Sequence, residues 1–463
     1  MRPLGKKFGV LPEEIEPLLH YACNVAGLKV VGVSFHVGSI AQDPTIYREA
    51  IANARAAFDV ADYLGIPKMQ ILNIGGGFRS STSLFEEIAV AEEKHEAGQP
   101  LYVLDLATIE GLMDKWNHSF PNVKPSYAVK CNTEPALITK LANLGANFDC
   151  ASLVEIDSVL SLGISPNRII FANPCKAISH IKHAAAVGVN LTTFDSEVEV
   201  DKIKKWHPHC RLLLRIKAPN DSGAMRPLGK KFGVLPEEIE PLLHYACNVA
   251  VLKVVGVSFH VGSIAQDPTI YREAIANARA AFDVADYLGI PKMQILNIGG
   301  GFRSSTSLFE EIAGVVNEAV KDYFPDPNLT MIAEPGRFFP ETAFTLVTHV
   351  IGKRVRGEKI EYWIDEGIYG SFRPTLYNSC FVGIKPLSTK ASEESSQICE
   401  STIYGPSCDS LDEVAVDIKL PELQLDDLIV FYNMGAYSKY VGSKFNGFDM
   451  LSTPTYLVST NSS

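Results

Sequence analysis

The chain has 463 residues, 46% of them hydrophobic and 21% charged, and its formal net charge is −11. This composition is ordinary for a globular protein, and the length suits two or three domains. The negative charge argues against a nucleic acid or an anionic membrane surface as partner, because both are bound through basic faces. No stretch approaches 18 uncharged apolar residues, and the N-terminus has no apolar run of the signal-peptide type. We therefore expect neither a membrane span nor a leader.

The nine cysteines are scattered along the chain, and none forms a C-x-x-C pair. Zinc sites and thioredoxin-like sites therefore have little support, and we predict no metal site. An odd cysteine count without a secretory signal indicates reduced thiols, so we expect a cytoplasmic protein.

The N-terminal part of the chain is a duplicate. Residues 1–89 recur at 225–313 with one difference, Gly27 against Val251. Such identity is too high for an old structural repeat, and it indicates a recent duplication or an error in the gene sequence. The copies diverge abruptly, because Val90 follows the first and Gly314 follows the second.

From residue 98 onward, short β-rich runs alternate with helical patterns. One predicted helix begins with Asp267 as N-cap and Pro268 in its first turn, and Gly289 is its C-cap. Such alternation predicts a parallel sheet, and eight units close a (β/α)8 barrel. The eight runs are SYAVK (126–130), NFDCAS (147–152), RIIFAN (168–173), NLTTFD (190–195), RLLLRIK (211–217), VVGVSFHV (254–261), QILNIGGG (294–301) and TMIAEPGR (330–337).

The barrel reaches eight strands with the second copy alone, and a closed barrel cannot accept two more. We therefore assign residues 98–338 to the barrel and residues 1–89 to a non-functional fragment of it. After Phe338, apolar runs follow one another without helical periodicity, so residues 339–463 are predicted to form an all-β domain. The predicted fold class is thus α/β plus all-β. The runs of this last domain are FTLVTHVIG, EYWIDEGI, FVGIKPL, EVAVDIKL, LIVFYNMG and TYLVS.

Barrels of this kind carry their chemistry at the C-terminal ends of the strands, with phosphate often bound after strands seven and eight. Here those ends read GGG (299–301) and EPGR (334–337). Glycines let backbone N–H groups approach a phosphate, and Arg337 adds a charged fork. A lone GGG is as often a tight turn, but two phosphate-competent ends at the expected strands favour a phosphate site.

Two further strand ends carry candidate catalytic side chains. Lys130 follows the first strand and His260 the sixth. A lysine in this position is usually a solvated rim residue, and an isolated histidine is usually part of a core. A lysine inside an apolar barrel mouth is desolvated, however, which lowers its pKa and suits imine formation. Together with an acid such as Glu334, these groups form the set that pyridoxal phosphate (PLP) requires.

Residues 98–463 resemble the eukaryotic branch of the ornithine/lysine/diaminopimelate decarboxylase family, which depends on PLP and has an alanine-racemase-like fold. The order and spacing of the motifs carry this resemblance, since each motif is short. They are YAVKCN (127–132), NFDCAS with Glu155, FHVGS (259–263), GGGF (299–302), EPGRF (334–338), GPSCD (405–409), NMGAY (433–437) and FNGF (445–448).

The resemblance implies a role for each matching residue. Lys130 would form a Schiff base with PLP, His260 would stack on its ring, and Glu334 would pair with the ring nitrogen. Cys408 would reprotonate the substrate carbon after CO₂ leaves, and Asp409 would bind the distal amine. In this family the last two residues reach the other subunit's active site, which implies a homodimer. The phosphate would be held by Ser263, Gly301, Gly336, Arg337 and Tyr437, with Pro335 in the same segment; Asp149, Glu155 and Arg215 would support the lysine and the ring.

The chain departs from the family in two places. The family usually has Leu-Tyr-Asp where this chain has Leu376, Tyr377 and Asn378, so one charge that shares the distal ammonium is lost. Ser379 replaces a common histidine. Lysine could therefore compete with ornithine as substrate, or ornithine use could simply be weaker. The second departure is residues 1–89, which replace a segment that normally supplies strand material to the β domain.

Two other functions remain open. A non-catalytic regulator resembling antizyme inhibitor would keep the fold and bind a protein such as antizyme. Retention of Lys130, His260, Arg337 and Cys408 argues against it. Diaminopimelate decarboxylase needs a cation for the distal carboxylate, whereas Asp409 suits an ammonium. The sequence thus favours decarboxylation of ornithine to putrescine, in polyamine biosynthesis.

Overall fold

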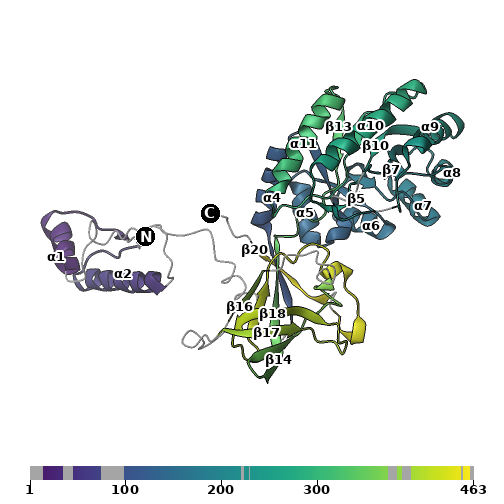
Figure 1. The fold of residues 1–463 in the computed structure, drawn as a ribbon. Coiled ribbons are helices and arrows are strands. Elements are labelled where there is room, and N and C mark those ends of the chain that lie inside the picture. Colours follow the sequence, from purple (N-terminus) through teal and green to yellow (C-terminus); the bar gives the residue numbers. More distant parts are fainter. Residues whose placement is uncertain are drawn as a thin grey trace. The chain divides into compact units, whose positions relative to one another are not determined.

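The computed structural model describes residues 14–34, 45–73, 99–219, 224–228, 230–373, 383–387, 398–449 and 452–458. The chain divides into two compact units, Met1–Ser83 with Ser463, and Leu84–Ser462. The larger unit contains a barrel and a β domain, and the smaller one contains the first copy (Figure 1). No helix among the described residues is long and apolar enough to cross a membrane.

Eight parallel strands close the barrel in the order β10-β12-β13-β4-β5-β6-β7-β8. Each of the eight predicted runs supplies one strand, so the predicted barrel is confirmed. Strands β10 and β12 come from the second copy. The strands are β4 (Val123–Ala128), β5 (Asn147–Cys150), β6 (Ile169–Phe171), β7 (Leu191–Phe194), β8 (Arg211–Arg215), β10 (Lys253–Ser258), β12 (Ile295–Asn297) and β13 (Thr330–Ala333).

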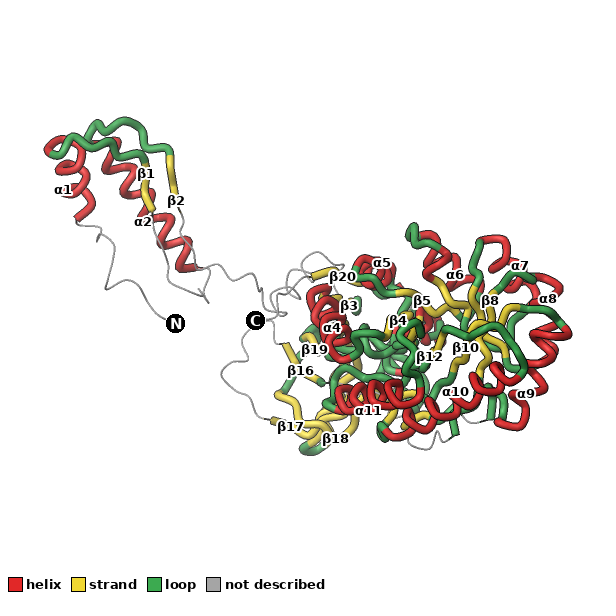
Figure 2. Tube along the Cα trace, turned by 90° about the horizontal axis from the view of Figure 1, so that it is seen from above, coloured by secondary structure: helices red, strands yellow, loops and turns green. Residues whose placement is uncertain are grey.

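Helices surround these strands (Figure 2). The strands are covered on both faces, which is why consecutive residues such as Leu212, Leu213 and Leu214 are all buried. Strands β9 (Ala224–Arg226) and β11 (Ser263–Ala265) form a separate two-stranded antiparallel sheet. In the sequence, β9 follows β8 and β11 follows β10. The helices are α4 (Leu106–Ser119), α5 (Pro135–Asn143), α6 (Leu153–Ser161), α7 (Ile178–Val187), α8 (Glu197–Trp206), α9 (Pro236–His244), α10 (Thr269–Tyr287) and α11 (Leu308–Tyr323).

The ends of helix α10 differ slightly from the prediction. Pro268 is the N-cap, and Asp267 lies one residue before it. The Asp267 carboxylate still accepts a hydrogen bond from the Thr269 backbone N–H at 2.9 Å, so it satisfies a free donor of the first turn. Gly289 lies one residue beyond the C-cap and has a φ of +67°, a left-handed conformation that favours glycine.

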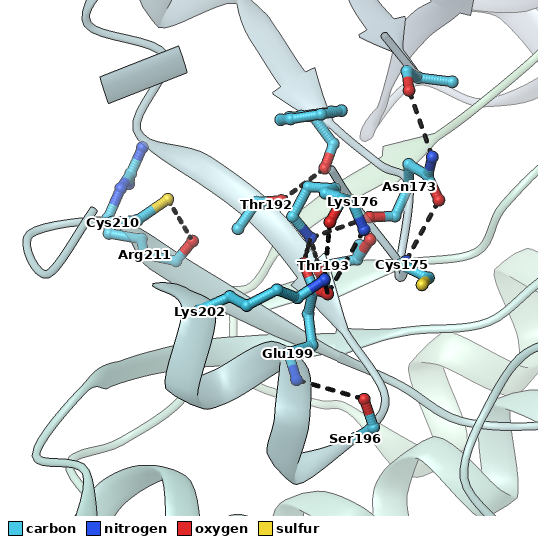
Figure 3. A network of polar contacts seen from close by, with 12 residues as sticks. Asn173, Cys175, Lys176, Thr192, Thr193, Ser196, Glu199, Lys202, Cys210 and Arg211 are labelled. Carbon is cyan, nitrogen blue, oxygen red and sulfur yellow. Dashed lines mark hydrogen bonds and ion pairs between the residues drawn. The ribbon is translucent and has the colours of Figure 1, made fainter. Parts of the chain in front are cut away.

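A buried ion pair ties together two loops at the C-terminal ends of the strands (Figure 3). Lys176 follows β6, and its Nζ lies 2.8 Å from Glu199 in the first turn of α8. The same Nζ donates to the backbone carbonyls of Asn173 and Thr193. Burial lowers the pKa of Lys176, and Glu199 opposes that shift. Removing Glu199 would leave the buried charge of Lys176 uncompensated, which costs about 3–5 kcal/mol, whereas Glu199 has a second partner, Lys202.

The β domain is confirmed as a separate sheet domain, in the order β16-β19-β14-β15-β17-β18 with β3 and β20 attached. Its strands include one that the sequence analysis did not identify, β17, whose run ICESTIY mixes polar and apolar residues. The strands are β3 (Leu101–Asp105), β14 (Phe344–Arg356), β15 (Lys359–Ile364), β16 (Ile384–Leu387), β17 (Ile398–Tyr404), β18 (Glu413–Pro421), β19 (Leu428–Phe431) and β20 (Thr455–Val458).

Strand β3 corrects two predictions. Residues 101–105 were assigned to the barrel, but they pair antiparallel with β14 and parallel with β20. The segment that precedes the barrel therefore does supply strand material to the β domain, and residues 1–89 do not replace it. The physical reason is that β3 is apolar on both faces. Both faces are covered in the β domain, where Leu101, Tyr102, Val103 and Leu104 are all buried.

The smaller unit is a strand–helix–strand segment with a short helix before it. Its elements are α1 (Ile15–His20), β1 (Gly32–Ser34), α2 (Thr45–Tyr63) and β2 (Ile71–Asn73). Strands β1 and β2 pair in parallel. A small apolar cluster holds the unit together, formed by Ala61, Ile66 and Met69 with Leu19, Cys23, Val30, Val33, Phe58 and Leu64 around them.

Candidate active site

Lys130 lies just beyond β4, in a short 3-10 turn (Val129–Cys131). Its Nζ donates to Asp149 Oδ2 at 2.9 Å, and Asp149 is buried at the end of β5. Burial opposes the charge on Lys130, but Asp149, then Tyr437 and Glu334, outweigh it, so its pKa is raised. The predicted lowering of this pKa is therefore wrong, because the sequence does not show that a carboxylate faces the lysine.

Glu334 follows β13 and is buried. Asn297, the last residue of β12, donates from its side-chain Nδ2 to Glu334 Oε1 at 2.6 Å. Burial, with Asp149 adding to it, raises the pKa of Glu334 to about 7, although Arg215 and Lys130 oppose the shift. This carboxyl can therefore hold or release a proton near neutral pH.

His260 follows β10 and presents a neutral ring. Its Nδ1 accepts a hydrogen bond from the Gly262 backbone N–H at 3.0 Å. Burial, and then the charges of Arg215 and Lys130, lower its pKa well below the ordinary value. The backbone at Gly300 passes so close that a Cβ there would lie 3.0 Å from His260 Nε2. His260 is thus a fixed, uncharged aromatic surface.

The glycines beside His260 are required by their surroundings. Gly301 has a φ of +111°, and a Cβ there would lie 2.8 Å from the Tyr271 hydroxyl. A Cβ on Gly336 would lie 2.8 Å from the Tyr437 hydroxyl. Tyr437 comes from the β domain, and its backbone N–H donates to the Cys131 carbonyl. The β domain therefore completes the barrel mouth.

One cavity collects most of the predicted cofactor residues. Arg337 lies in its wall, and its Nη1 donates to Glu341 Oε1 at 3.1 Å. The cavity is lined by Ala128, Lys130, His260, Ser263, Gly301, Phe302, Glu334, Gly336, Arg337 and Tyr437.

Three buried polar atoms around this region have no partner among the described residues: Asp149 Oδ1, Ser258 Oγ and Arg337 Nε. Buried polar groups are rarely left unsatisfied, so such atoms indicate a missing ligand or water. The groups around the cavity fit the parts of PLP. The Lys130 amine suits its aldehyde, the Glu334 carboxyl suits its ring nitrogen, and the neutral His260 ring suits its flat ring. The glycine loop and the Arg337 guanidinium suit its phosphate. No cluster of three metal-ligating side chains occurs within the described ranges.

The remaining predicted residues near the barrel are also placed. Glu155, in α6, accepts from the Ala151 backbone N–H at 2.7 Å; its pKa is raised by burial, against that hydrogen bond. Arg215 is buried at the end of β8, and burial lowers its pKa while Glu334 opposes the shift. The Pro335 carbonyl accepts from the Ala128 N–H, which joins the loop after β13 to β4.

The predicted proton donor and amine ligand lie elsewhere, in the loop between β17 and β18 (residues 405–412), called here the Cys408 loop. Cys408 is exposed, and its backbone N–H donates to Asn446 Oδ1 at 3.0 Å. The Tyr369 hydroxyl donates to Asp409 Oδ2. Neither Cys408 nor Asp409 lines the cavity of Lys130. Tyr377 and Asn378, predicted to bind substrate, lie outside the described residues.

Sequence reasoning missed two residues that hold this site together. Asn297 links Glu334 to the glycine loop, because its Oδ1 also accepts from the Gly299 N–H at 3.0 Å. Tyr271 donates to the Gly300 carbonyl and stacks on Phe302. A polar residue ending the apolar strand ILN was a usable signal for Asn297. No signal singled out Tyr271, which looks like any apolar position of helix α10.

Known proteins resemble this chain over most of its length. The profile of the family "Pyridoxal-dependent decarboxylase, pyridoxal binding domain" matches residues 3–97 and 106–341. The chloroplastic ornithine decarboxylase of Nicotiana glauca is 52% identical over 374 residues, which are 80% of this chain and 86% of the relative. Antizyme inhibitor 2 of Xenopus laevis is 42% identical over 381 residues, 79% of this chain and 82% of the relative.

Solved structures agree. The arginine decarboxylase of Paramecium bursaria Chlorella virus superposes with a TM-score of 0.76 at 38% identity, covering 80% of this chain and 99% of that one. Profile, sequence relatives and structural neighbour all cover the barrel that carries Lys130 and Glu334. The chain therefore belongs to the pyridoxal-dependent decarboxylases, which are carboxy-lyases that use PLP.

Proposed function

We propose that the chain decarboxylates ornithine to putrescine, with PLP held covalently through the amine of Lys130. The observation that carries the proposal is the barrel mouth, where Lys130, Glu334, His260 and Arg337 line one cavity. The resemblance to ornithine decarboxylases supports the choice of substrate.

When bound, PLP would supply the electron sink for the electron pair that stays on the substrate carbon when CO₂ leaves. The protein's own residues prepare that chemistry. Glu334 would face the ring nitrogen and hold a proton there, since its pKa of about 7 lets it act near neutral pH. Neutral His260 would cover one ring face without adding charge. Asp149, Glu155 and Arg215 would fix Lys130 and Glu334 in place.

The phosphate end needs donors and a positive charge. Arg337 has a buried Nε without a partner among the described residues, and its guanidinium lies over the Tyr437 ring, 5.5 Å from the centroid. We assign the phosphate to Arg337 and Tyr437 with Ser263, Gly301 and Gly336, because glycine N–H groups and a guanidinium are typical phosphate ligands.

Cys408 and Asp409 would act on the substrate end of a second protomer's site. Their contacts lie within the β domain, and Cys408 is exposed, so both are available to a neighbour. We infer a homodimer in which Cys408 returns a proton from its Sγ to the substrate carbon. Asp409, with Tyr377 and Asn378, would bind the distal ammonium.

A regulatory function is the second candidate, since Antizyme inhibitor 2 of Xenopus laevis is 42% identical. Such a protein would bind antizyme and would need no cofactor. The cytoplasmic location expected from the free thiols is likewise a proposal; the relative from Nicotiana glauca is named chloroplastic.

One assay separates these possibilities. Purified protein should show a visible absorbance band from bound PLP and should release CO₂ from ornithine faster than from lysine, arginine or diaminopimelate. Borohydride should fix the cofactor on Lys130. A higher rate with lysine would change the proposed substrate, and absence of both the band and CO₂ release would favour the regulatory function.

A further inference from the structure

The two copies of the duplicated segment adopt the same local structure. In the first copy, Gly32, Val33 and Ser34 pair with Ile71, Leu72 and Asn73. In the second, Gly256, Val257 and Ser258 pair with Ile295, Leu296 and Asn297 in the same register. Helices α2 and α10 span the same nineteen residues of the repeat. The first copy is therefore a ready-made barrel segment.

The copies differ in what covers them. Leu18 is 49% exposed, but its counterpart Leu242 is 5% exposed. Ile71 is 55% exposed, and its counterpart Ile295 is 8% exposed. The greater exposure is confined to particular positions of the first copy, because Tyr63 and its counterpart Tyr287 are equally exposed, at 82% and 81%. The first copy thus leaves open the faces that the barrel covers in the second.

The barrel also shows what covers those faces. Strand β10 pairs with β8 on one side, and β12 pairs with β13 on the other. In the part of the first copy that the structure describes, β1 and β2 pair only with each other. Both outer edges of this pair are therefore open to strands that fit them, and open edges are templates for pairing with another chain.

The single sequence difference favours the first copy. Val251 has a φ of +57°, in the left-handed region where a β-branched residue is strained. Gly27 occupies the same conformation, with a φ of +63°, and glycine adopts it freely. The cost of the left-handed conformation for valine corresponds to about a tenfold preference for the first copy over the second, when both compete for the same position in a barrel.

We propose that residues 1–89 are an exchange segment, which takes the place of residues 225–313 in the barrel of a second copy of this chain. The first copy carries His36 and the glycines at 75–77, which correspond to His260 and to the glycines at 299–301. A barrel completed in this way keeps its own Lys130 and Glu334. The displaced second copy then exposes the same faces and can enter a further barrel, so exchange builds larger assemblies.

Activity in a mixture of two full-length variants tests the exchange, and this arm rests on the proposed function. One chain carries Lys130→Ala, and the other carries His36→Ala with His260→Ala. Neither chain has a complete set of active-site side chains in its own barrel, and both keep Cys408. Refolded together, they should regain CO₂ release, because the first copy of the Lys130→Ala chain supplies a histidine to the other barrel. An inactive mixture, with active wild type, would overturn the proposal.

Surface variants identify which copy has moved. Adding Leu18→Asp and Ile71→Asp to the Lys130→Ala chain should lower the regained activity about tenfold, since only the less favoured second copy can then exchange. Adding Tyr63→Asp instead should leave the regained activity unchanged, because that position is exposed in both copies. Equal activity with all three chains would show that the first copy does not enter.

Light scattering gives a readout that needs no activity. Wild-type protein refolded at increasing concentration should form assemblies above the size of a dimer. Leu18→Asp with Ile71→Asp should reduce them to the smaller amount that exchange of the second copy alone can form, while Tyr63→Asp should leave them unchanged. If the wild type forms the assemblies but releases no CO₂, the proposed function is rejected and the exchange is not. If the amount of assembly is the same in the wild type and in all these variants, the exchange is rejected.

Discussion

The barrel mouth and the Cys408 loop are built in opposite ways. At the mouth, Lys130, Asp149 and Glu334 come from neighbouring strand ends; Lys130 bonds to the buried Asp149, and Glu334 accepts a buried hydrogen bond from Asn297. In the Cys408 loop, Cys408 is exposed, and the contacts of its neighbour Asp409 are to Tyr369 and to its own loop.

This difference indicates a division of labour. Chemistry that depends on fixed charges requires a desolvated, rigid site, and the barrel supplies it. The loop is nevertheless well fixed: the buried carboxylate of Asp412 accepts from the N–H groups of Ile368 and Ser407. A loop that is fixed but exposed suits a contribution to another protomer's site.

Mixing two defective chains is the strongest test of that division. Lys130→Ala should abolish putrescine formation and Cys408→Ala should lower it by at least about a hundredfold, because each removes one half of every site. Their mixture should recover activity, since a heterodimer contains one barrel with Lys130 that faces a partner with Cys408. Putrescine should be measured after dissociation and reassociation. If the mixture stays inactive while the wild type survives the same treatment, the two halves belong to one chain.

Cys408→Ala alone sharpens the comparison at the loop. A positioned proton donor contributes about 10²–10⁴-fold, so putrescine formation should fall by at least about a hundredfold. The visible band of bound PLP should stay, because Cys408 does not line the cavity. Cys175→Ala is the matched control, since Cys175 is also exposed and lies on the barrel. A normal rate for Cys408→Ala would remove the assigned role.

Asn378→Asp tests the substrate end. A restored carboxylate would strengthen the contact to a distal ammonium by about 1.4 kcal/mol, so kcat/KM for ornithine should rise roughly tenfold. The gain should exceed that for any amino acid without a distal ammonium. An unchanged or lower kcat/KM would show that position 378 is not the amine site, or that its neighbours have adapted to asparagine.

An effect on stability, with no change in chemistry, is expected at Glu366, which supports the turn that contacts the Cys408 loop. It is buried and accepts from the Gly367 and Ser371 N–H groups and the Ser371 hydroxyl. Burial, opposed by these hydrogen bonds, raises its pKa to about 7. The folded state thus binds this proton more tightly than the unfolded state, so stability falls as pH rises from 4.5 to 7.

Glu366→Gln should remove that loss. At pH 8 the variant should be more stable by up to ~3 kcal/mol, seen as a Tm higher by a few degrees, and at pH 4 the gain should vanish. Glu358→Gln, in an exposed turn, should leave the pH dependence unchanged. A Tm difference between Glu366→Gln and wild type that is independent of pH would mean that Glu366 is ionised throughout.

The barrel was predictable because its strands are buried on both faces and separated by amphipathic helices, a pattern that local sequence encodes. Strand β17 was missed because ICESTIY alternates imperfectly, and only pairing with β15 and β18 makes it a strand. Strand β3 was misassigned for the opposite reason. Its apolar run fits either domain, and the choice depends on β14, more than 200 residues away.

The site was predictable where a motif lies at a strand end, as for Lys130, His260 and Glu334. The electrostatics were not, because they depend on which groups face each other across the barrel. The raised pKa of Lys130 follows from Asp149, and the sequence separation of these two residues does not show that contact. The duplicated segment makes the same point: identical residues are buried in one copy and exposed in the other.

Closure of the barrel has a consequence for stoichiometry. Eight strands leave no vacancy, so one copy of the duplicated segment can enter a barrel only when another leaves. A complete cofactor pocket also requires Lys130 and the EPGR segment, and each occurs once per chain. Duplication of the histidine and glycine motifs therefore adds no capacity. Titration with PLP should saturate at one equivalent per chain, whichever copy fills the barrel.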